Sequence, residues 1–274
     1  MKSKSATLKV LVLGTMLVLS CAYLLPLYVM VTTSLKPLEE INQRTYLALS
    51  SNLQFSNYLE AWQLISPSLV NSTIIAFAVT MLSMFIGGLS GYYLSRSRST
   101  FTRVLFILVG IALYLPYQVI LIPLVQVMAF TRLALTHWGL ILSYLVLNVP
   151  LASVLMGTFF LSVPRELEEA AAIDGASKVQ IFFRIVTPVS LPAYASVAII
   201  IFTQVWNEFL LALTLSTQAT TTVQLKLAEI KGSFVALYNM QMAAALITVL
   251  VPLAFFLLLG RYFVRGILAG AMKG

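Results

Sequence analysis

The chain has 274 residues, of which 60% are hydrophobic and 9% are charged, and its mean hydropathy is +0.96. A soluble domain of this composition would expose a large apolar area to water, at about 25 cal/mol for each Å². The composition therefore excludes an ordinary soluble protein. A net charge of +8 is compatible with an anionic partner, but basic residues beside anionic lipid headgroups explain it more simply.

Long apolar runs recur along the whole chain. A helix needs about 20 apolar residues to cross a hydrocarbon core of about 30 Å, and six runs reach that length. They predict an all-α polytopic membrane protein with six transmembrane helices, in a single domain over 1–274 and with no independent soluble domain. The predicted spans cover 10–33, 69–94, 104–130, 138–161, 190–213 and 242–260.

The first run follows three lysines and resembles a secretion signal at first sight. Its apolar part is longer than the 7–15 residues of a typical signal peptide, and no small-residue cleavage site follows it. We therefore expect an uncleaved membrane anchor. The single cysteine, Cys21, lies inside this run, so no intrachain disulfide is possible.

The Lys and Arg residues are distributed unevenly between alternate sides of the predicted spans, and this asymmetry sets the orientation. With the N-terminus in the cytoplasm, 12 of the 17 basic residues lie on the cytoplasmic side and 5 lie outside. We expect both termini, and the loop at 162–189, to be cytoplasmic. The five residues expected outside are Lys36, Arg44, Arg132, Lys226 and Lys231.

The loop at 162–189 reads as two short helices. Ser162 and Pro164 suit the start of the first helix, and Leu167, Ala170, Ala171 and Asp174 fall on one of its faces. Small alanines on that face allow close approach to another surface. A glycine after Asp174 supplies a break at the C-terminus of the helix, and Ser177 with Gln180 has the spacing of a capping box for the second helix.

The order of residues in this loop is more specific than its amphipathic shape. Glu169-Ala-Ala is followed by three residues, Gly175, nine residues, Ile185 and then Pro188. This pattern resembles the cytoplasmic loop of ABC-importer permeases, although Thr187 stands where that family usually has Leu. A generic amphipathic helix-turn-helix at the lipid interface is the alternative interpretation.

Other segments extend the resemblance to nearly the whole chain. Trp206-Asn207-Glu208 and the terminus at 261–274 are similar to the carbohydrate-uptake, maltose-type smaller permease subunit. Ser34-Leu-Lys36 and Pro116-Tyr-Gln118 also resemble that subfamily. The resemblance implies a multi-pass permease of the bacterial cytoplasmic membrane.

The resemblance also implies a set of partners. They are membrane lipid, a second and different permease subunit, two ATPase subunits that bind ATP and Mg, and an extracytoplasmic substrate-binding protein facing the external loop at 216–238; no nucleic acid is implied. The expected ATPase-coupling element consists of Glu169, Ala170, Ala171, Asp174 and Gly175. The expected C-terminal ATPase contact consists of Ala271, Met272, Lys273 and Gly274.

Polar and aromatic residues inside the predicted spans are candidates for the substrate path. Their donors, acceptors and ring faces suit sugar hydroxyls, but such residues also make hydrogen bonds between membrane helices. Glu208 is the one acid placed within a span, where an ionisable group is a functional candidate, and an interfacial carboxylate is the alternative. The candidates are Gln118, Asn148, Gln204, Asn207, Glu208, Tyr114 and Tyr117.

The sequence contains no motif for ATP binding and few residues suited to catalysis. It has no Gly-x-x-x-x-Gly-Lys-Ser/Thr phosphate loop, and His137 is its only histidine. We therefore expect a transporter subunit that is not an enzyme and that carries no cofactor or metal of its own. The predicted cargo is a sugar or related glycoside. The alternatives are a glycerol-phosphate ester carried by a permease of the same family, and a stand-alone secondary carrier that uses Glu208.

Overall fold

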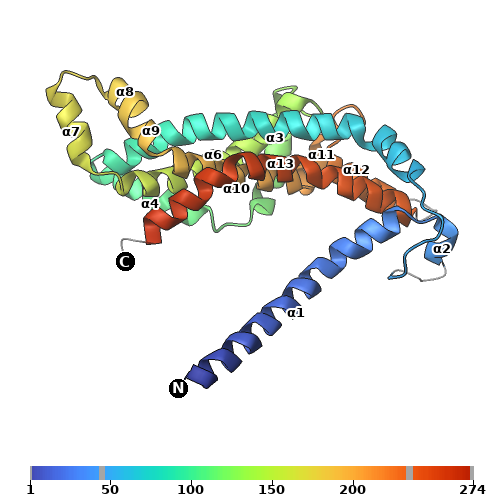
Figure 1. The fold of residues 1–274 in the computed structure, drawn as a ribbon. Helices are drawn as coiled ribbons and strands as arrows, with labels where there is room; N and C mark the ends of the chain where they lie inside the picture. The colour runs from blue at the N-terminus through green and yellow to red at the C-terminus, as the bar shows by residue number, and fades with distance from the viewer. Residues whose placement is uncertain (1, 43–46, 233–236, 272–274) are drawn as a thin grey trace. The chain divides into compact units, whose positions relative to one another are not determined.

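The computed structural model describes the backbone of residues 2–42, 47–232 and 237–271, and the side chains of 9–41, 47–232 and 237–262. Every regular element in these ranges is a helix, so the predicted all-α fold is confirmed (Figure 1). The helices are α1 (Lys2–Ser34), α2 (Leu38–Asn42), α3 (Ser56–Arg96), α4 (Thr100–Ala112), η1 (Tyr117–Ile120), α5 (Leu121–Phe130), α6 (His137–Leu161), α7 (Arg165–Ile173), α8 (Lys178–Ile181), η2 (Phe182–Val186), α9 (Thr187–Val189), α10 (Leu191–Asn207), α11 (Leu210–Leu215), α12 (Val223–Lys231) and α13 (Tyr238–Ala271).

Four helices in the described part of the chain are long and apolar enough to cross a membrane by themselves. Two further pairs pass the same test if each bent pair counts as one span, which gives up to six. The four single spans are Lys9–Ser34, Ser56–Arg96, His137–Leu161 and Tyr238–Tyr262. The bent pairs are Thr100–Ala112 with Tyr117–Phe130, at 97°, and Lys178–Val189 with Leu191–Asn207, at 77°.

Two of the predicted spans are interrupted rather than continuous. The run at 104–130 breaks before Pro116, whose backbone is extended (φ −60°, ψ 119°). Proline has no N–H and disfavours a helical conformation of the residue before it. The run at 190–213 breaks at Glu208, also extended (ψ 130°), before α11 begins at Leu210.

The chain divides into two compact units, although the sequence predicts a single domain. Unit 1 comprises Met1–Pro67 and Lys226–Val249. Within it, the Asn57 side chain donates to the carbonyls of Ser34 (2.9 Å) and Lys36 (3.0 Å) and accepts from Asn239 (3.0 Å). Asn57 therefore ties the end of α1 to the beginnings of α3 and α13.

Unit 2 comprises Ser68–Leu225 and Leu250–Gly274. Small residues bring α3 and α6 together: a Cβ atom added to Gly91 would lie 2.6 Å from the Ser153 carbonyl oxygen and 2.8 Å from the Gly157 nitrogen. The Ser90 and Ser153 hydroxyls also lie 2.6 Å apart. The glycines of the second predicted span thus serve close helix packing.

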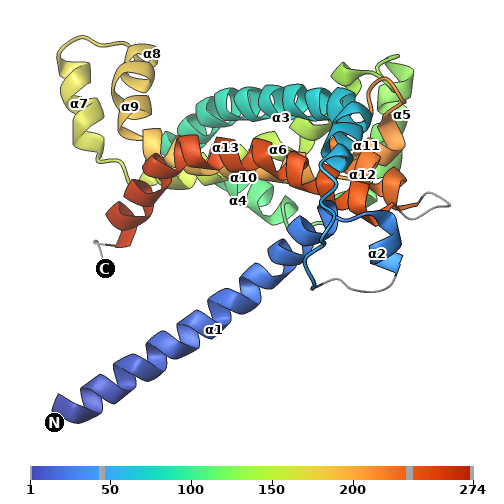
Figure 2. The same cartoon turned by 45° about the vertical axis from the view of Figure 1, so that its right-hand side comes forward.

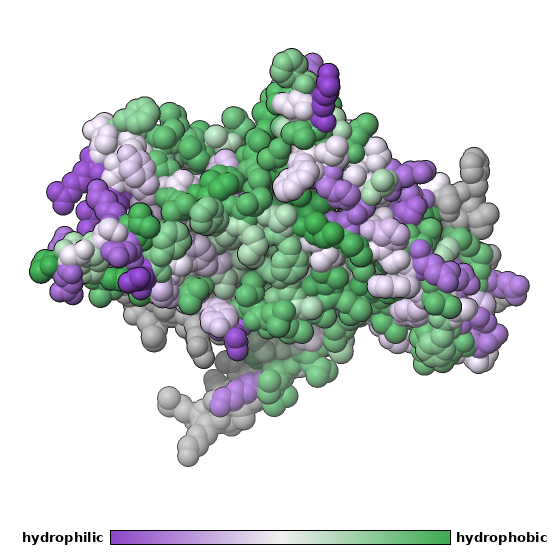
Figure 3. Space-filling model, turned by 90° about the horizontal axis from the view of Figure 1, so that it is seen from above, coloured by the Kyte–Doolittle hydropathy of each residue, from purple (hydrophilic) through white to green (hydrophobic). Residues whose placement is uncertain are grey.

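Aromatic rings join α10 to the C-terminal helix in unit 2. The rings of Phe202 and Phe255 stack with centroids 4.1 Å apart, and Phe77 of α3 meets both edge-on at 5.5 Å. Figure 2 shows the ribbons of α10 and α13 side by side. Figure 3 shows apolar residues over the middle of the visible face, and polar residues both at the left, where α7 and α8 lie, and at the right. The polar residues at α7 and α8 suit a hairpin at the membrane surface.

Candidate coupling and translocation sites

The loop at 162–189 folds as a short helical hairpin, α7 followed by α8, at one end of unit 2 (Figure 1). The sequence prediction that Ser162 begins the first helix is wrong. Ser162 is the C-cap of α6, and α7 begins at Arg165 after Pro164 in the N-cap position. The predicted capping box of α8 is confirmed, because Ser177 and Gln180 exchange both hydrogen bonds.

Gly175 makes the turn between the two helices. Its φ of +84° lies in the left-handed region that glycine adopts without strain. The Ala176 N–H donates to the Ala171 carbonyl and the Gly175 N–H donates to the Ala172 carbonyl, at 3.0 and 3.1 Å. This pattern is a Schellman motif, so the break predicted after Asp174 is confirmed.

The hairpin presents most of the predicted coupling residues outward. Glu169, Ala170 and Asp174 are exposed, whereas Ala171 is 7% exposed and lies on the inner face. The predicted common face of Leu167, Ala170, Ala171 and Asp174 is therefore not one contact face: Ala171 packs inward and the other three side chains remain exposed.

Glu168 is the functional candidate that the sequence prediction left out of the coupling element. Its Oε1 accepts from Arg96 Nε at 2.7 Å and forms an ion pair with Arg96 Nη2 at 2.6 Å, and its Oε2 accepts from the Tyr92 hydroxyl at 2.7 Å. Arg96 and Tyr92 precede Glu168 by more than 70 residues. No local sequence pattern reveals a pairing of that range.

A cavity of about 600 Å³ lies between the end of α3 and the hairpin. Tyr92, Tyr93 and Arg96 line it from α3, while Glu168 and Glu169 line it from α7. The hairpin therefore rests on α3 through a few side chains rather than a continuous packed surface.

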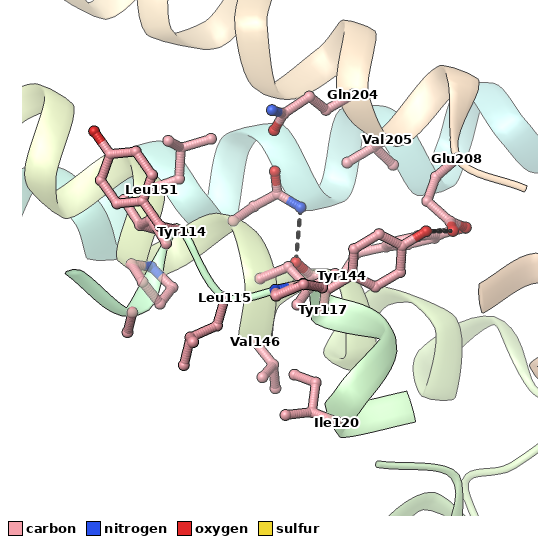
Figure 4. Close-up of a pocket in the computed structure, with 16 residues that line it drawn as sticks. Tyr114, Leu115, Tyr117, Ile120, Tyr144, Val146, Leu151, Gln204, Val205 and Glu208 are labelled. Atoms are coloured by element: carbon pink, nitrogen blue, oxygen red, sulfur yellow. Dashed lines mark hydrogen bonds between the residues drawn. The ribbon is translucent and has the colours of Figure 1, made fainter. Parts of the chain in front are cut away.

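A second cavity, of about 770 Å³, lies among α4, η1, α6 and α10. Five of the seven predicted path residues line it: Tyr114, Tyr117, Asn148, Gln204 and Glu208 (Figure 4). The other two lie elsewhere. Gln118 is exposed in η1, and Asn207 donates to the Thr203 carbonyl and accepts from Gln224.

Glu208 joins three segments at the edge of this cavity. Its carboxylate accepts from the hydroxyls of Tyr117 (3.0 Å) and Tyr144 (2.9 Å), and both phenol groups point toward it in Figure 4. It also accepts from the backbone N–H groups of Leu211 (2.9 Å) and Ala212 (3.3 Å) at the start of α11. Glu208 thus sits at a break between helices rather than inside a continuous span.

The lining of this cavity contains Glu208 as its acidic side chain and no Lys or Arg. Asn148 is buried and donates to the Tyr144 carbonyl at 2.8 Å, which is a contact within its own helix. Gln204 is exposed and faces the cavity from α10 (Figure 4). The cavity therefore offers tyrosine rings, an amide and apolar walls.

The predicted C-terminal contact falls at the limit of the structure. Ala271 is the last residue of α13, and its side chain is outside the described residues. Met272, Lys273 and Gly274 also lie outside the described residues.

Comparison with known families identifies this architecture. Residues 83–269 match the family described as the binding-protein-dependent transport system inner membrane component. The chain belongs to this family. The predicted ABC-importer permease is therefore confirmed, and the chain is a multi-pass inner-membrane component of a transporter rather than an enzyme.

Curated relatives of the permease cover nearly its full length. The chain is 33% identical over 271 residues to the glucose import system permease protein GlcU of Saccharolobus solfataricus, covering 94% of this chain and 93% of the relative. It is 31% identical over 261 residues to the melibiose/raffinose/stachyose import permease protein MelC of Bacillus subtilis, with 94% of each chain covered.

A solved structure has the same fold at low sequence identity. A chain of a bacterial ABC transporter involved in the import of the acidic polysaccharide alginate superposes with a TM-score of 0.79. The match is 19% identical and covers 93% of the permease and 97% of that chain.

Proposed function

We propose that this permease is the smaller membrane subunit of an ATP-driven importer for a neutral sugar or glycoside. The observation that carries the proposal is its family membership together with full-length similarity to permeases named for glucose and for melibiose, raffinose and stachyose. A third relative, 35% identical over 85% of this chain, is named for alpha-glucoside transport.

The α7–α8 hairpin is the proposed contact for a separate ATPase. Its exposed Glu169 offers an ionic or hydrogen-bonding group, Ala170 allows close approach, and Gly175 sets the angle of the turn. The proposed assembly contains a second, different permease, two ATPase subunits that bind ATP and Mg, and an extracytoplasmic binding protein. Residues 271–274 are a second proposed ATPase contact, and both termini are cytoplasmic in this arrangement.

The cavity beside Glu208 is the proposed contribution of this chain to the translocation path. Tyr114 and Tyr117 can pack against the C–H faces of a sugar ring, while Gln204 offers a donor and an acceptor to hydroxyl groups. A phosphate ester would enter a lining that has a carboxylate and no Lys or Arg, which electrostatics disfavours. This charge favours a neutral sugar over a glycerol-phosphate ester.

The contacts of Glu208 also disfavour a stand-alone carrier. A coupling group in such a carrier has to exchange its proton or ion during transport, whereas this carboxylate accepts hydrogen bonds from four donors, two tyrosine hydroxyls and two backbone N–H groups. The contacts suit a fixed structural link between segments.

Purification of the tagged chain in mild detergent, with mass spectrometry of the proteins that remain bound, tests the assembly. We expect an ATPase and a second permease in fixed ratio. Proteoliposomes with the complex and its binding protein should then take up glucose, melibiose or maltose only when ATP is supplied. Recovery of a monodisperse chain alone, or ATP-independent uptake driven by a proton gradient, would overturn the proposal; preferred uptake of glycerol 3-phosphate would overturn the substrate class.

A further inference from the structure

The side chain of Glu168, in α7 of the hairpin, makes a polar connection to the long helix α3. Both carboxylate oxygens of Glu168 are used, one by Arg96 and the other by Tyr92, at 2.6–2.7 Å. Arg96 Nη2 also donates to the Val163 carbonyl at 2.9 Å, which fixes the chain just before α7. Charge-assisted bonds of this length are among the stronger contacts that side chains make.

Glu168 is largely buried, whereas other side chains of α7 are exposed. The side chain of Glu168 is 15% exposed and that of Arg96 is 12% exposed. By contrast, Glu166, Glu169 and Ile173 are exposed on the same helix. The outward face is thus free for a partner, and Glu168 with Ala171 forms the face that meets the permease itself.

The partner of Glu168 on α3 belongs to an aromatic cluster that reaches the cavity-lining helices. The Tyr92 ring lies 5.8 Å from Phe160 of α6 and 5.1 Å from Phe182 of η2. Phe160 in turn lies 6.3 Å from Tyr194 of α10. Helices α6 and α10 both line the cavity beside Glu208, and this aromatic cluster therefore connects Tyr92 to both of them.

We infer that Glu168 is a positioning residue that transmits displacement of α7 to α3 and, through Tyr92, to the cavity-lining helices α6 and α10. This inference rests on the proposed function, in which an ATPase moves the hairpin. In this arrangement Glu169, which is exposed although it also lines the cavity beside α3, remains accessible to the ATPase, whereas Glu168 is bonded to α3. The two adjacent acids thus have separate tasks. Loss of Glu168 leaves the ATPase bound and active but separates its cycle from the cavity.

A labelling experiment on the full complex measures this transmission without a known cargo. The background chain carries Cys21→Ala and Gln204→Cys, which places one reactive thiol in the cavity. In proteoliposomes, the rate of labelling by N-ethylmaleimide is compared between the nucleotide-free complex and the complex trapped with ATP and vanadate. The expected background result is a clear difference between the two rates.

Glu168→Ala is expected to reduce this nucleotide-dependent difference by about fivefold or more, a typical size for coupling between sites. ATP hydrolysis and ATPase retention are expected to stay close to the background level. Glu166→Ala removes the same charge from the exposed face of α7 and is expected to leave the labelling difference unchanged. Arg96→Ala combined with Tyr92→Phe removes both partners of Glu168 on α3, so this double variant is expected to match Glu168→Ala. Adding Glu168→Ala to the double variant is expected to have no further effect.

An unchanged labelling difference in Glu168→Ala, or a further loss when Glu168→Ala is added to the combined Arg96 and Tyr92 substitutions, would overturn the inference. If the alanine variant does not assemble, Glu168→Gln keeps the shape and removes the charge, and an assembled Gln variant with the full background response overturns it equally. Failure of the proposed function looks different: the background complex itself then shows no ATP hydrolysis and no nucleotide-dependent labelling.

Discussion

Glu208 is the residue at which three membrane segments meet. Its four donors come from the broken third span (Tyr117), from α6 (Tyr144) and from the start of α11 (Leu211 and Ala212). A carboxylate accepts through both oxygens and suits four donors, whereas few other side chains do. The sequence marked Glu208 as the acid within a span, and the contacts explain the acid as a link between segments.

Glu208→Gln tests that link. Glutamine has a similar shape, but its NH₂ group would face donors, so at least one buried group loses its partner. We expect the chain to be destabilised by about 1–3 kcal/mol, measured as a lower denaturation temperature in detergent. Tyr117→Phe should destabilise less, because it removes one hydroxyl. Tyr114→Phe is the matched control, since Tyr114 is 90% exposed; an equal loss in all three variants would contradict the link.

Substitutions of Gly175 test the backbone conformation of the turn alone, because a Cβ atom added there would meet nothing within 4 Å. Only its φ of +84° resists substitution, and residues with a Cβ lose about 1–2 kcal/mol in that region. Asparagine tolerates the conformation better than alanine, and valine tolerates it least. We expect co-purification of the ATPase to fall in the order Asn, Ala, Val, with Val lower by about tenfold. Membrane insertion should be unchanged, and equal recovery with all three variants would contradict the role of the turn.

At the scale of elements, close contact between α3 and α6 holds the body of unit 2 together. Gly91 faces the backbone of α6 at Ser153 and Gly157, and backbone atoms cannot move aside as a flexible side chain can. In membrane proteins such small-residue contacts provide much of the packing between helices. The small size of these glycines therefore stabilises the packing of α3 against α6 rather than the conformation of α3 alone.

Gly91→Ala should force α3 and α6 apart and destabilise the chain by about 1–3 kcal/mol. Gly110→Ala is the matched control: Gly110 lies in α4 with nothing within 4 Å of an added Cβ. There alanine should be neutral or slightly stabilising, by up to about 1 kcal/mol, because glycine is the poorer helix former. Thermal denaturation of both detergent-solubilised variants checks the contrast, and a Gly91→Ala variant as stable as Gly110→Ala would show that the helices do not touch.

Local chemistry explains which elements were predictable from the sequence. The turn at Gly175 and the capping box at Ser177 depend on residues within a few positions, and both were predicted. The break at Pro116 was missed because the apolar run continues through it, although the proline itself was the available signal. The break at Glu208 and the pairing of Glu168 with Arg96 depend on distant partners, which one sequence does not reveal.

For the molecule as a whole, the two candidate sites of unit 2 lie toward opposite ends of α6. Tyr144 contacts Glu208 at one end and Phe160 contacts Tyr92 at the other. Tyr144 and Phe160 are 16 positions apart in one helix, which corresponds to about 24 Å. A transport cycle that starts at the hairpin therefore has to act along the length of α6 to reach the cavity.

The orientation of α6 across the membrane can be tested with one residue on each side of the helix. Helix α6 is 25 residues long, or about 37 Å, which exceeds a hydrocarbon core of about 30 Å. Thr131 precedes this span and Ile173, 86% exposed, follows it, so we expect the two residues to lie on opposite sides of the membrane. The excess of basic residues on one side of the predicted spans predicts that Ile173 lies in the cytoplasm. In a Cys21→Ala background, an impermeant maleimide added to intact cells should label Thr131→Cys and should label Ile173→Cys only after the cells are permeabilised. The reverse pattern would put the hairpin outside, out of reach of any cytoplasmic ATPase, and labelling of both sites in intact cells would mean that α6 does not cross the membrane.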